Sequence, residues 1–162
     1  MNSLNRIEAY PQPDYRQDLV IEALQKAAQN ELLTCSLYRQ VKSAELDEAR
    51  VGFRDLAYSA YEEDLSHFQT LQECIRLLQE QPDGHELPSY QLALLPPDTD
   101  SSCCLLGQIE KAEKTSIYYQ QAICAMTIGY NYKVFDLAYA LLNENIQHNL
   151  LVQEYLTGSV AQ

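Results

Sequence analysis

The sequence lacks paired CxxC motifs, so an iron site built from four cysteine thiolates has no ligands here. The chain has five cysteines, an odd number without the regular spacing of a disulfide framework. Cys103 and Cys104 are adjacent and cannot easily bridge each other. This pattern favours a reducing compartment over a secreted, disulfide-stapled scaffold.

The sequence also lacks a long apolar run. No stretch approaches the length that a membrane-spanning helix requires. Residues 1–15 are polar and contain two prolines, which is not the pattern of a signal peptide. We therefore expect a cytoplasmic protein that contacts no membrane.

Positive charge is scarce, with 11 Lys and Arg residues against 23 Asp and Glu residues and a net charge of −12. Nucleic acids and anionic membranes repel such a surface, so neither is an expected partner. A negatively charged surface of this kind is compatible with the binding of cations. At 162 residues and 46% hydrophobic residues, the chain is long and apolar enough for one globular domain.

Core-facing residues recur at alternating steps of four and three residues in four segments, which is the pattern of amphipathic helices in a bundle. We predict helices from about Asp18 to the weak pattern at 43–48, from about Asp47 or Glu48 to Gln79, from about Ser102 to Ile128, and from the turn near 129–131 to about 157. Residues 1–16 are predicted to form an arm, residues 17–157 the bundle, and residues 158–162 a tail.

The predicted second and third helices are separated by residues 80–102, which are rich in turn signals: Pro82, Asp83-Gly84, Pro88 and Pro96-Pro97. More than twenty residues without helical periodicity are unusual inside a compact domain. A connection of this length is expected where two consecutive helices run parallel. The fold class is therefore all-α, an up-down four-helix bundle with a long crossover between helices two and three.

Polar residues interrupt the core-facing rows near the middle of three helices: Glu31, Asp64, His67, Asn145 and His148. A buried carboxylate is costly unless it is paired, protonated or bound to a metal. Asp64 and His67 are three residues apart on one helix face and could hold one metal ion. The same residues could instead form a hydrogen-bonded network that fixes the register of the bundle.

With these residues placed, the chain resembles the ferritin-like superfamily, especially its bacterioferritin, rubrerythrin and Dps-like branches. The resemblance spans residues 18–156, and four pieces carry it: Asn30–Leu33 with Tyr38, Glu62–His67, Ile109–Lys114 with Tyr118, Tyr119, Ala122 and Ile123, and Leu141–His148. It implies a di-iron or di-manganese site whose ligands come from Glu31, Asp64, His67, Glu110, Glu113, Glu144 and His148. Tyr38, Tyr118 and Tyr119 could lie near such a site, although tyrosines at helical spacing are usually core residues with one polar end.

Three positions depart from the pattern of that superfamily. Asp64 and Asn145 stand where it has glutamate, and the core-facing row of the third helix passes through Ala112, with Glu110 and Glu113 beside it. Glu31, Asp64 and His67 thus make a half-site, and a second half would need Glu113 or Glu144 to turn inward.

Two functions remain open at this point, and a third, iron storage, would require the subunits to close into a hollow shell. The resemblance implies a metal-binding protein that oxidises ferrous iron or reduces peroxide and self-associates into a dimer or a larger homo-oligomer. The alternative is a bundle with a degraded metal site that serves as a non-enzymatic binding or assembly module.

Overall fold

The computed structural model describes residues 15–43, 46, 48, 50–79 and 102–157. They form four α-helices: α1 (Gln17–Val41), α2 (Phe53–Leu78), α3 (Ser102–Thr127) and α4 (Tyr132–Thr157). This confirms the predicted all-α class. The predicted crossover over 80–101 and the predicted tail lie outside the described residues, as does the predicted arm apart from Tyr15 and Arg16.

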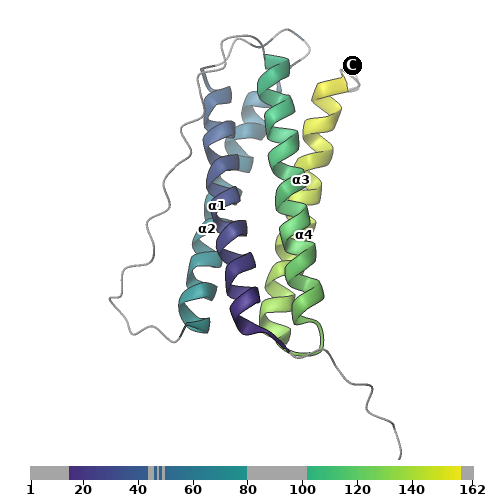
Figure 1. The fold of residues 1–162 in the computed structure, drawn as a ribbon. Helices are drawn as coiled ribbons and strands as arrows, with labels where there is room; N and C mark the ends of the chain where they lie inside the picture. The colour runs from purple at the N-terminus through teal and green to yellow at the C-terminus, as the bar shows by residue number, and fades with distance from the viewer. Residues whose placement is uncertain (1–14, 44–45, 47, 49, 80–101, 158–162) are drawn as a thin grey trace, which may run out of the picture.

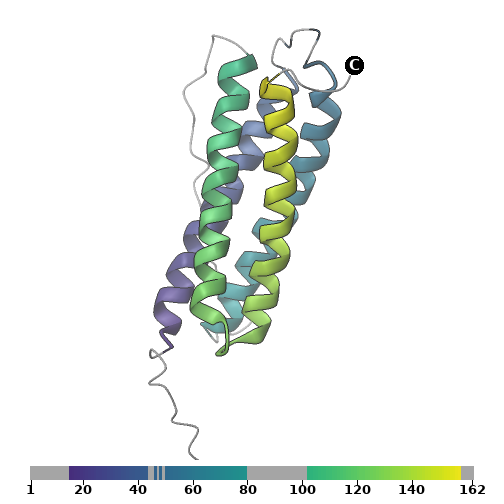
Figure 2. The ribbon, with the colours of Figure 1, turned by 90° about the vertical axis from the view of Figure 1, so that its right-hand side faces the viewer.

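The helices are arranged as two antiparallel hairpins, α1 with α2 and α3 with α4, which lie against each other (Figure 1; Figure 2). The hairpins meet mainly through α1 and α3, whereas α2 and α4 make few backbone approaches. In Figure 1, α2 and α3 run in the same direction, as the predicted crossover requires. The α2–α4 seam is therefore the loosely packed side of the bundle.

The predicted core-facing rows of α1 and α4 are confirmed. The four-and-three spacing selects seven positions on α1, and all are buried: Val20, Leu24, Ala27, Glu31, Thr34, Tyr38 and Val41. On α4 it selects Tyr155, which is partly exposed, and six buried positions: Val134, Ala138, Leu141, Asn145, His148 and Val152. The predicted start of α2 at Asp47 or Glu48 was wrong, because the helix begins at Phe53. Gly52, a weak helix former, precedes it, and a Cβ at Gly52 would approach the Tyr155 hydroxyl oxygen to 3.1 Å.

The predicted core-facing row of α3 was wrong by one residue over part of its length. Its buried positions are Leu105, Leu106, Ile109, Ala112, Glu113, Ser116, Gln120, Ile123 and Thr127. Glu113, Gln120 and Thr127 are fully buried, while the apolar Tyr119 and Met126 are only partly buried. The sequence analysis favoured Tyr119 and Met126 because they are apolar. The structure instead buries the polar residues that follow them, Gln120 and Thr127.

The turn predicted near 129–131 is confirmed, and it joins α3 to α4. Gly129 has a positive φ of 79°, a conformation that glycine adopts without the steric cost of a Cβ. Two backbone amides, of Tyr130 and Asn131, donate to the Thr127 carbonyl at 3.0 and 2.9 Å and close the end of α3. The Asn131 side chain accepts from the Val134 amide at 3.2 Å and caps the start of α4.

The apolar core consists of two clusters. One is centred on Leu37, Phe53, Leu106 and Ile109, and the other on Leu24, Leu71, Ile75 and Ile123. Buried polar residues near the middles of the four helices separate them. Within the described ranges, no helix has the length and apolar character that would let it cross a membrane.

We expect Leu71→Ala to destabilise the metal-free protein by about 2–5 kcal/mol, because a fully buried side chain is lost from the apolar cluster centred on Leu24, Ile75 and Ile123. Leu77→Ala on the same helix is the matched control, since Leu77 is 61% exposed. Urea unfolding followed by circular dichroism measures both. Equal destabilisation by the two variants would contradict this packing.

Candidate metal centre

Six buried polar side chains from all four helices meet near the middle of the bundle. They are Glu31 from α1, Asp64 and His67 from α2, Glu113 from α3, and Asn145 and His148 from α4, and none is more than 6% exposed. Three are carboxylates. Burying three carboxylates costs free energy, which the other groups of the site must offset.

These side chains form two groups that share Asp64. In the first, His67 Nδ1 lies 3.7 Å from Glu31 Oε2 and 3.5 Å from Asp64 Oδ1. In the second, His148 Nδ1 lies 3.2 Å from Asp64 Oδ1 and 3.5 Å from Glu113 Oε1. Within each group the potential ligand atoms all lie within 4.8 Å of one another, so each group could hold a metal ion. The two imidazole rings are stacked at 6.2 Å.

The other ring nitrogen of each histidine contacts a carboxylate across the α2–α4 seam. His148 Nε2 lies 2.6 Å from Glu63 Oε2, and His67 Nε2 is in contact with Glu144 Oε2. Both glutamates are about half exposed. A carboxylate that holds the proton on Nε2 leaves the Nδ1 lone pair free to face the centre, which is how metal-bound histidines are usually oriented.

Glu63 was not among the predicted ligands; four residues before His67, it was expected most simply on a solvated face, with a contribution to the site left open. The pattern Glu-Asp-x-x-His at 63–67 recurs 81 residues later as Glu-Asn-x-x-His at 144–148. The repeat predicts equivalent positions for Glu63 and Glu144. In the structure both are outer partners of a histidine and neither is in a candidate metal group.

Three further side chains orient the inner carboxylates. The Tyr38 hydroxyl donates to Glu113 Oε1 at 2.9 Å. Asn145 Nδ2 donates to Glu31 Oε1 and to Glu113 Oε2, both at 3.3 Å. The Thr34 hydroxyl donates to the Glu31 carbonyl at 2.8 Å and lies 3.5 Å from its Oε2. Asn145 therefore links the carboxylates of the two groups.

Several buried atoms of the centre make no hydrogen bond. They are both carboxylate oxygens of Asp64, Nδ1 of His67, Nδ1 of His148 and Oδ1 of Asn145. Buried polar atoms are almost always hydrogen-bonded in folded proteins. Here Asp64 Oδ1 has only ion-pair contacts, with His67 Nδ1 at 3.5 Å and His148 Nδ1 at 3.2 Å, so a cation between these atoms would satisfy them. Oxygen and imidazole nitrogen donors suit iron, manganese and zinc. The residues present fit a metal centre.

The electrostatics of the metal-free centre reflect three buried carboxylates beside two imidazoles. Burial raises the pKa of Glu31 and raises that of Asp64 well above its usual range. Burial alone would lower the pKa of His67, but the facing carboxylates of Glu31 and Asp64 raise it to about 9. For His148 the carboxylates of Asp64 and Glu113 outweigh burial and raise the pKa to about 11. Both imidazoles thus hold their protons at neutral pH.

Two neighbouring groups are kept protonated by the same field. Burial, followed by the charges of Glu113 and Asp64, raises the pKa of Tyr38 well above its ordinary value. Burial and the charge of Asp64 raise the pKa of the Cys35 thiol, which contacts the Tyr61 carbonyl at 3.7 Å. Cys35 is therefore a protonated, buried thiol rather than a metal ligand.

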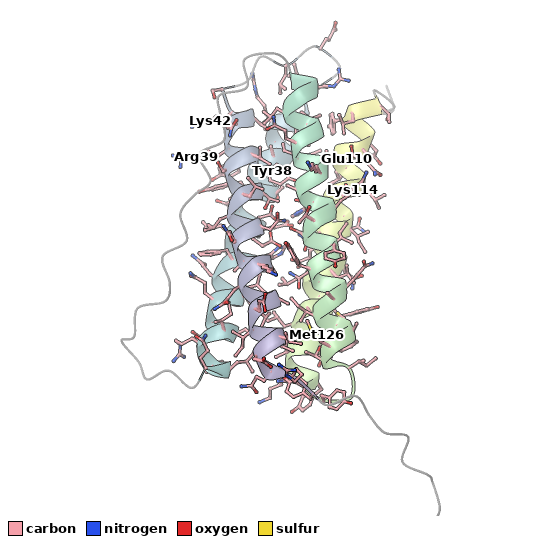
Figure 3. The ribbon with its side chains drawn as sticks, viewed as in Figure 1. Tyr38, Arg39, Lys42, Glu110, Lys114 and Met126 are labelled. Carbon is pink, nitrogen blue, oxygen red and sulfur yellow. The ribbon has the colours of Figure 1, made fainter. Side chains whose placement is uncertain are left out.

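The structure brings five of the seven predicted ligand residues into the two groups: Glu31, Asp64, His67, Glu113 and His148. Glu144 lies just outside, on His67. Glu110 lies apart on α3, where it pairs with Lys114 at 2.6 Å and accepts from Gln153 (Figure 3). Of the three tyrosines considered, Tyr38 touches the centre, whereas Tyr118 is 66% exposed and stacks edge-on against Tyr119.

A search of protein-family models found no match. The DNA protection during starvation protein of Pyrococcus furiosus is 30% identical over 149 residues, covering 86% of this chain and 77% of the relative. A dodecameric thioferritin, the bacterioferritin-related protein from Bacteroides fragilis, superposes with a TM-score of 0.74 at 24% identity, covering 88% of this chain and 86% of that one. A ferritin-like diiron-carboxylate protein from Bacillus anthracis str. Ames superposes with a TM-score of 0.71 at 14% identity, covering 89% and 99%.

The two structural neighbours show the shared four-helix fold, and the identity to the Pyrococcus furiosus protein extends over most of both chains. The chain belongs to the ferritin-like superfamily, in the family of the DNA protection during starvation protein.

Proposed function

We propose that the centre binds two iron ions, one in each group, and that the protein oxidises ferrous iron. The observation that carries this proposal is the set of four unsatisfied buried atoms on Asp64, His67 and His148. A hydrogen-bonded core network would leave no such atoms, because its members would satisfy one another. The names of the relatives, which include diiron-carboxylate and bacterioferritin-related proteins, support the choice of iron; manganese is the nearest alternative.

The charges of the site support two ions. Glu31, Asp64 and Glu113 supply three negative charges inside the centre, and Glu63 and Glu144 add two at its edge. Two divalent ions carry four positive charges, which the three inner carboxylates offset in part and all five carboxylates exceed by one charge. The inward position of Glu113 completes the second group, which a core-facing Ala112 would have left without a carboxylate from α3.

The chain's own residues prepare the site for this chemistry. When bound, two ferrous ions would supply two electrons, which with two protons would reduce one dioxygen molecule to hydrogen peroxide, or one hydrogen peroxide molecule to two water molecules. Glu63 and Glu144 hold the Nε2 protons and so aim each Nδ1 inward. Tyr38 fixes one oxygen of Glu113. The apolar clusters above and below keep bulk water away from the carboxylates.

Further features complete the proposal. The dodecameric state of the Bacteroides fragilis protein supports a homo-oligomer. The free cysteines Cys35, Cys74 and Cys124 support a reducing, cytoplasmic setting. The net charge of −12 argues against coating of DNA, so protection would act by removing ferrous iron and oxidant.

The alternative, a metal-free binding or assembly module, has one observation in its favour. Asn145 donates to two carboxylates that would otherwise repel each other, which is what a structural network needs. The amount of iron that the folded protein retains distinguishes the two functions.

We expect the wild-type protein, loaded anaerobically with ferrous iron, to retain about two irons per chain by elemental analysis, one for each candidate group. Asp64→Ala should retain less than one, because Asp64 belongs to both groups. Glu110→Ala, which removes the same charge from a residue outside the centre, should load like the wild type. A folded wild-type protein that retains no metal would support the assembly module instead.

Asn145→Asp adds a fourth carboxylate at the position that now bridges the two groups by hydrogen bonds. We expect it to destabilise the metal-free protein by roughly 2 kcal/mol, because a buried charge loses two hydrogen bonds, and to raise iron affinity about tenfold or more. Thermal unfolding with and without ferrous iron measures both effects. Asn143→Asp makes the same change at an exposed site on α4 and should alter neither.

Iron binding should release protons. At pH 7 the imidazoles of His67, with a pKa of about 9, and His148, with a pKa of about 11, are protonated in the metal-free protein. Each must lose the Nδ1 proton to bind a metal, so about two protons should leave per chain and affinity should rise as pH rises from 6 to 8. Anaerobic calorimetry in two buffers of different ionisation enthalpy counts them. Binding without proton release would contradict this ligation.

A further inference from the structure

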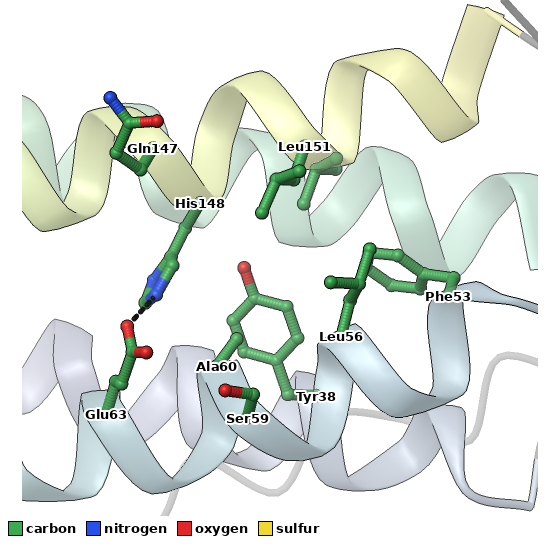
Figure 4. A pocket seen from close by; sticks show the side chains of 10 residues that line it. Tyr38, Phe53, Leu56, Ser59, Ala60, Glu63, Gln147, His148 and Leu151 are labelled. Carbon is green, nitrogen blue, oxygen red and sulfur yellow. Dashed lines mark hydrogen bonds and ion pairs between the residues drawn. The ribbon is translucent and has the colours of Figure 1, made fainter. Parts of the chain in front are cut away.

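A hollow of about 160 Å³ opens on the α2–α4 seam beside the second group (Figure 4). Its rim is formed by the exposed Ser59, Glu63 and Gln147, and its floor by Tyr38 and His148. One water molecule needs only about 10–15 Å³ of such space, so the hollow has room for several small molecules. It therefore leads from the surface to His148 of the centre and to Tyr38, which donates to Glu113.

Two of the residues that line the hollow, Ser59 and Ala60, are small. Ala60 lies in its wall between Tyr38 and Glu63, as Figure 4 shows. The position 81 residues later, which corresponds to it in the repeat, is Leu141, a buried leucine with three more carbon atoms. The His148 side is thus more open at this position than the corresponding place near His67.

Between the polar rim and the floor, the hollow is lined by apolar side chains. They are Phe53, Leu56, Ala60, Leu151 and Val152. A hydrated metal ion would lose its water shell on such walls at a large cost. A small neutral and apolar molecule loses little hydration and gains contacts, as xenon does in apolar cavities.

We propose that this hollow is the entrance through which dioxygen reaches the metal centre. It binds dioxygen against Ala60 and Leu151 and delivers it beside His148, while metal ions enter elsewhere. The role as an entrance rests on the proposed function. The binding of dioxygen in the hollow does not, and can be measured in the metal-free protein.

Two variants place the same bulk on either side of the seam. Ser59→Phe sets a ring at the rim of the hollow, and Ala140→Phe sets one at the corresponding exposed position 81 residues later. Neither residue belongs to the metal centre. Circular dichroism and thermal unfolding establish that both variants fold like the wild type.

The first experiment uses the metal-free protein and dissolved dioxygen, which is paramagnetic. Under oxygen pressure, the Ala60 methyl group, 7% exposed, should relax several-fold faster than the methyl groups of Leu150, 48% exposed and outside the hollow. Ser59→Phe should abolish this excess and Ala140→Phe should preserve it. Equal or slower relaxation at Ala60 would overturn the proposal.

The second experiment measures oxidation of preloaded ferrous iron by dioxygen in stopped flow. Ser59→Phe should slow it about tenfold or more, with unchanged anaerobic iron affinity, and Ala140→Phe should not slow it. Wild-type rates in Ser59→Phe, or slowing confined to Ala140→Phe, would overturn the entrance. If the wild type binds no iron, the proposed function fails, and the relaxation measurement still decides whether dioxygen enters the hollow.

Discussion

The burial of Asp64 is the constraint on which the centre depends. Its carboxylate is fully buried, neither oxygen makes a hydrogen bond, and it lies between two histidines from different helices. An unpaired carboxylate in such a place would unfold part of the bundle or take up a proton. The imidazoles of His67 and His148 compensate it in the metal-free protein, and cations would do so in the loaded one. Positive charge is therefore bound favourably near the middle of the bundle.

The need to compensate the buried carboxylate also explains why the helices pack unevenly. The hairpins are joined by extensive contacts between α1 and α3, whereas α2 and α4 approach each other little and are connected through His67–Glu144 and His148–Glu63. Ion pairs between long side chains can join two helices whose backbones lie farther apart than close apolar packing would place them. The seam therefore combines the polar partners of both histidines with an apolar hollow that reaches the surface.

Asn145 distinguishes this chain from the pattern of its superfamily. An amide at this position contributes no charge, but it donates to Glu31 and Glu113 and holds the carboxylates of the two groups together. A carboxylate there would add a fourth negative charge to a site whose pKa values already rise through burial. Asp64 is the one carboxylate that both candidate groups share.

Much of the fold and half of the centre followed from the order of residues alone. The four-and-three spacing placed Glu31, Asp64, His67, Asn145 and His148 on buried faces, because helical periodicity is a local property that the backbone imposes. The third helix could not be read in this way, since Glu113 is buried beside an equally buried Ala112. Which residue faces the centre depends on the rotation of α3 against α1 and α4, from which Tyr38 and Asn145 respectively donate to Glu113. The sequence by itself determined which helices form and which faces they bury. Only the tertiary structure decided that Glu113 completes the second group and that Glu63 supports His148, because both contacts join residues distant in the chain.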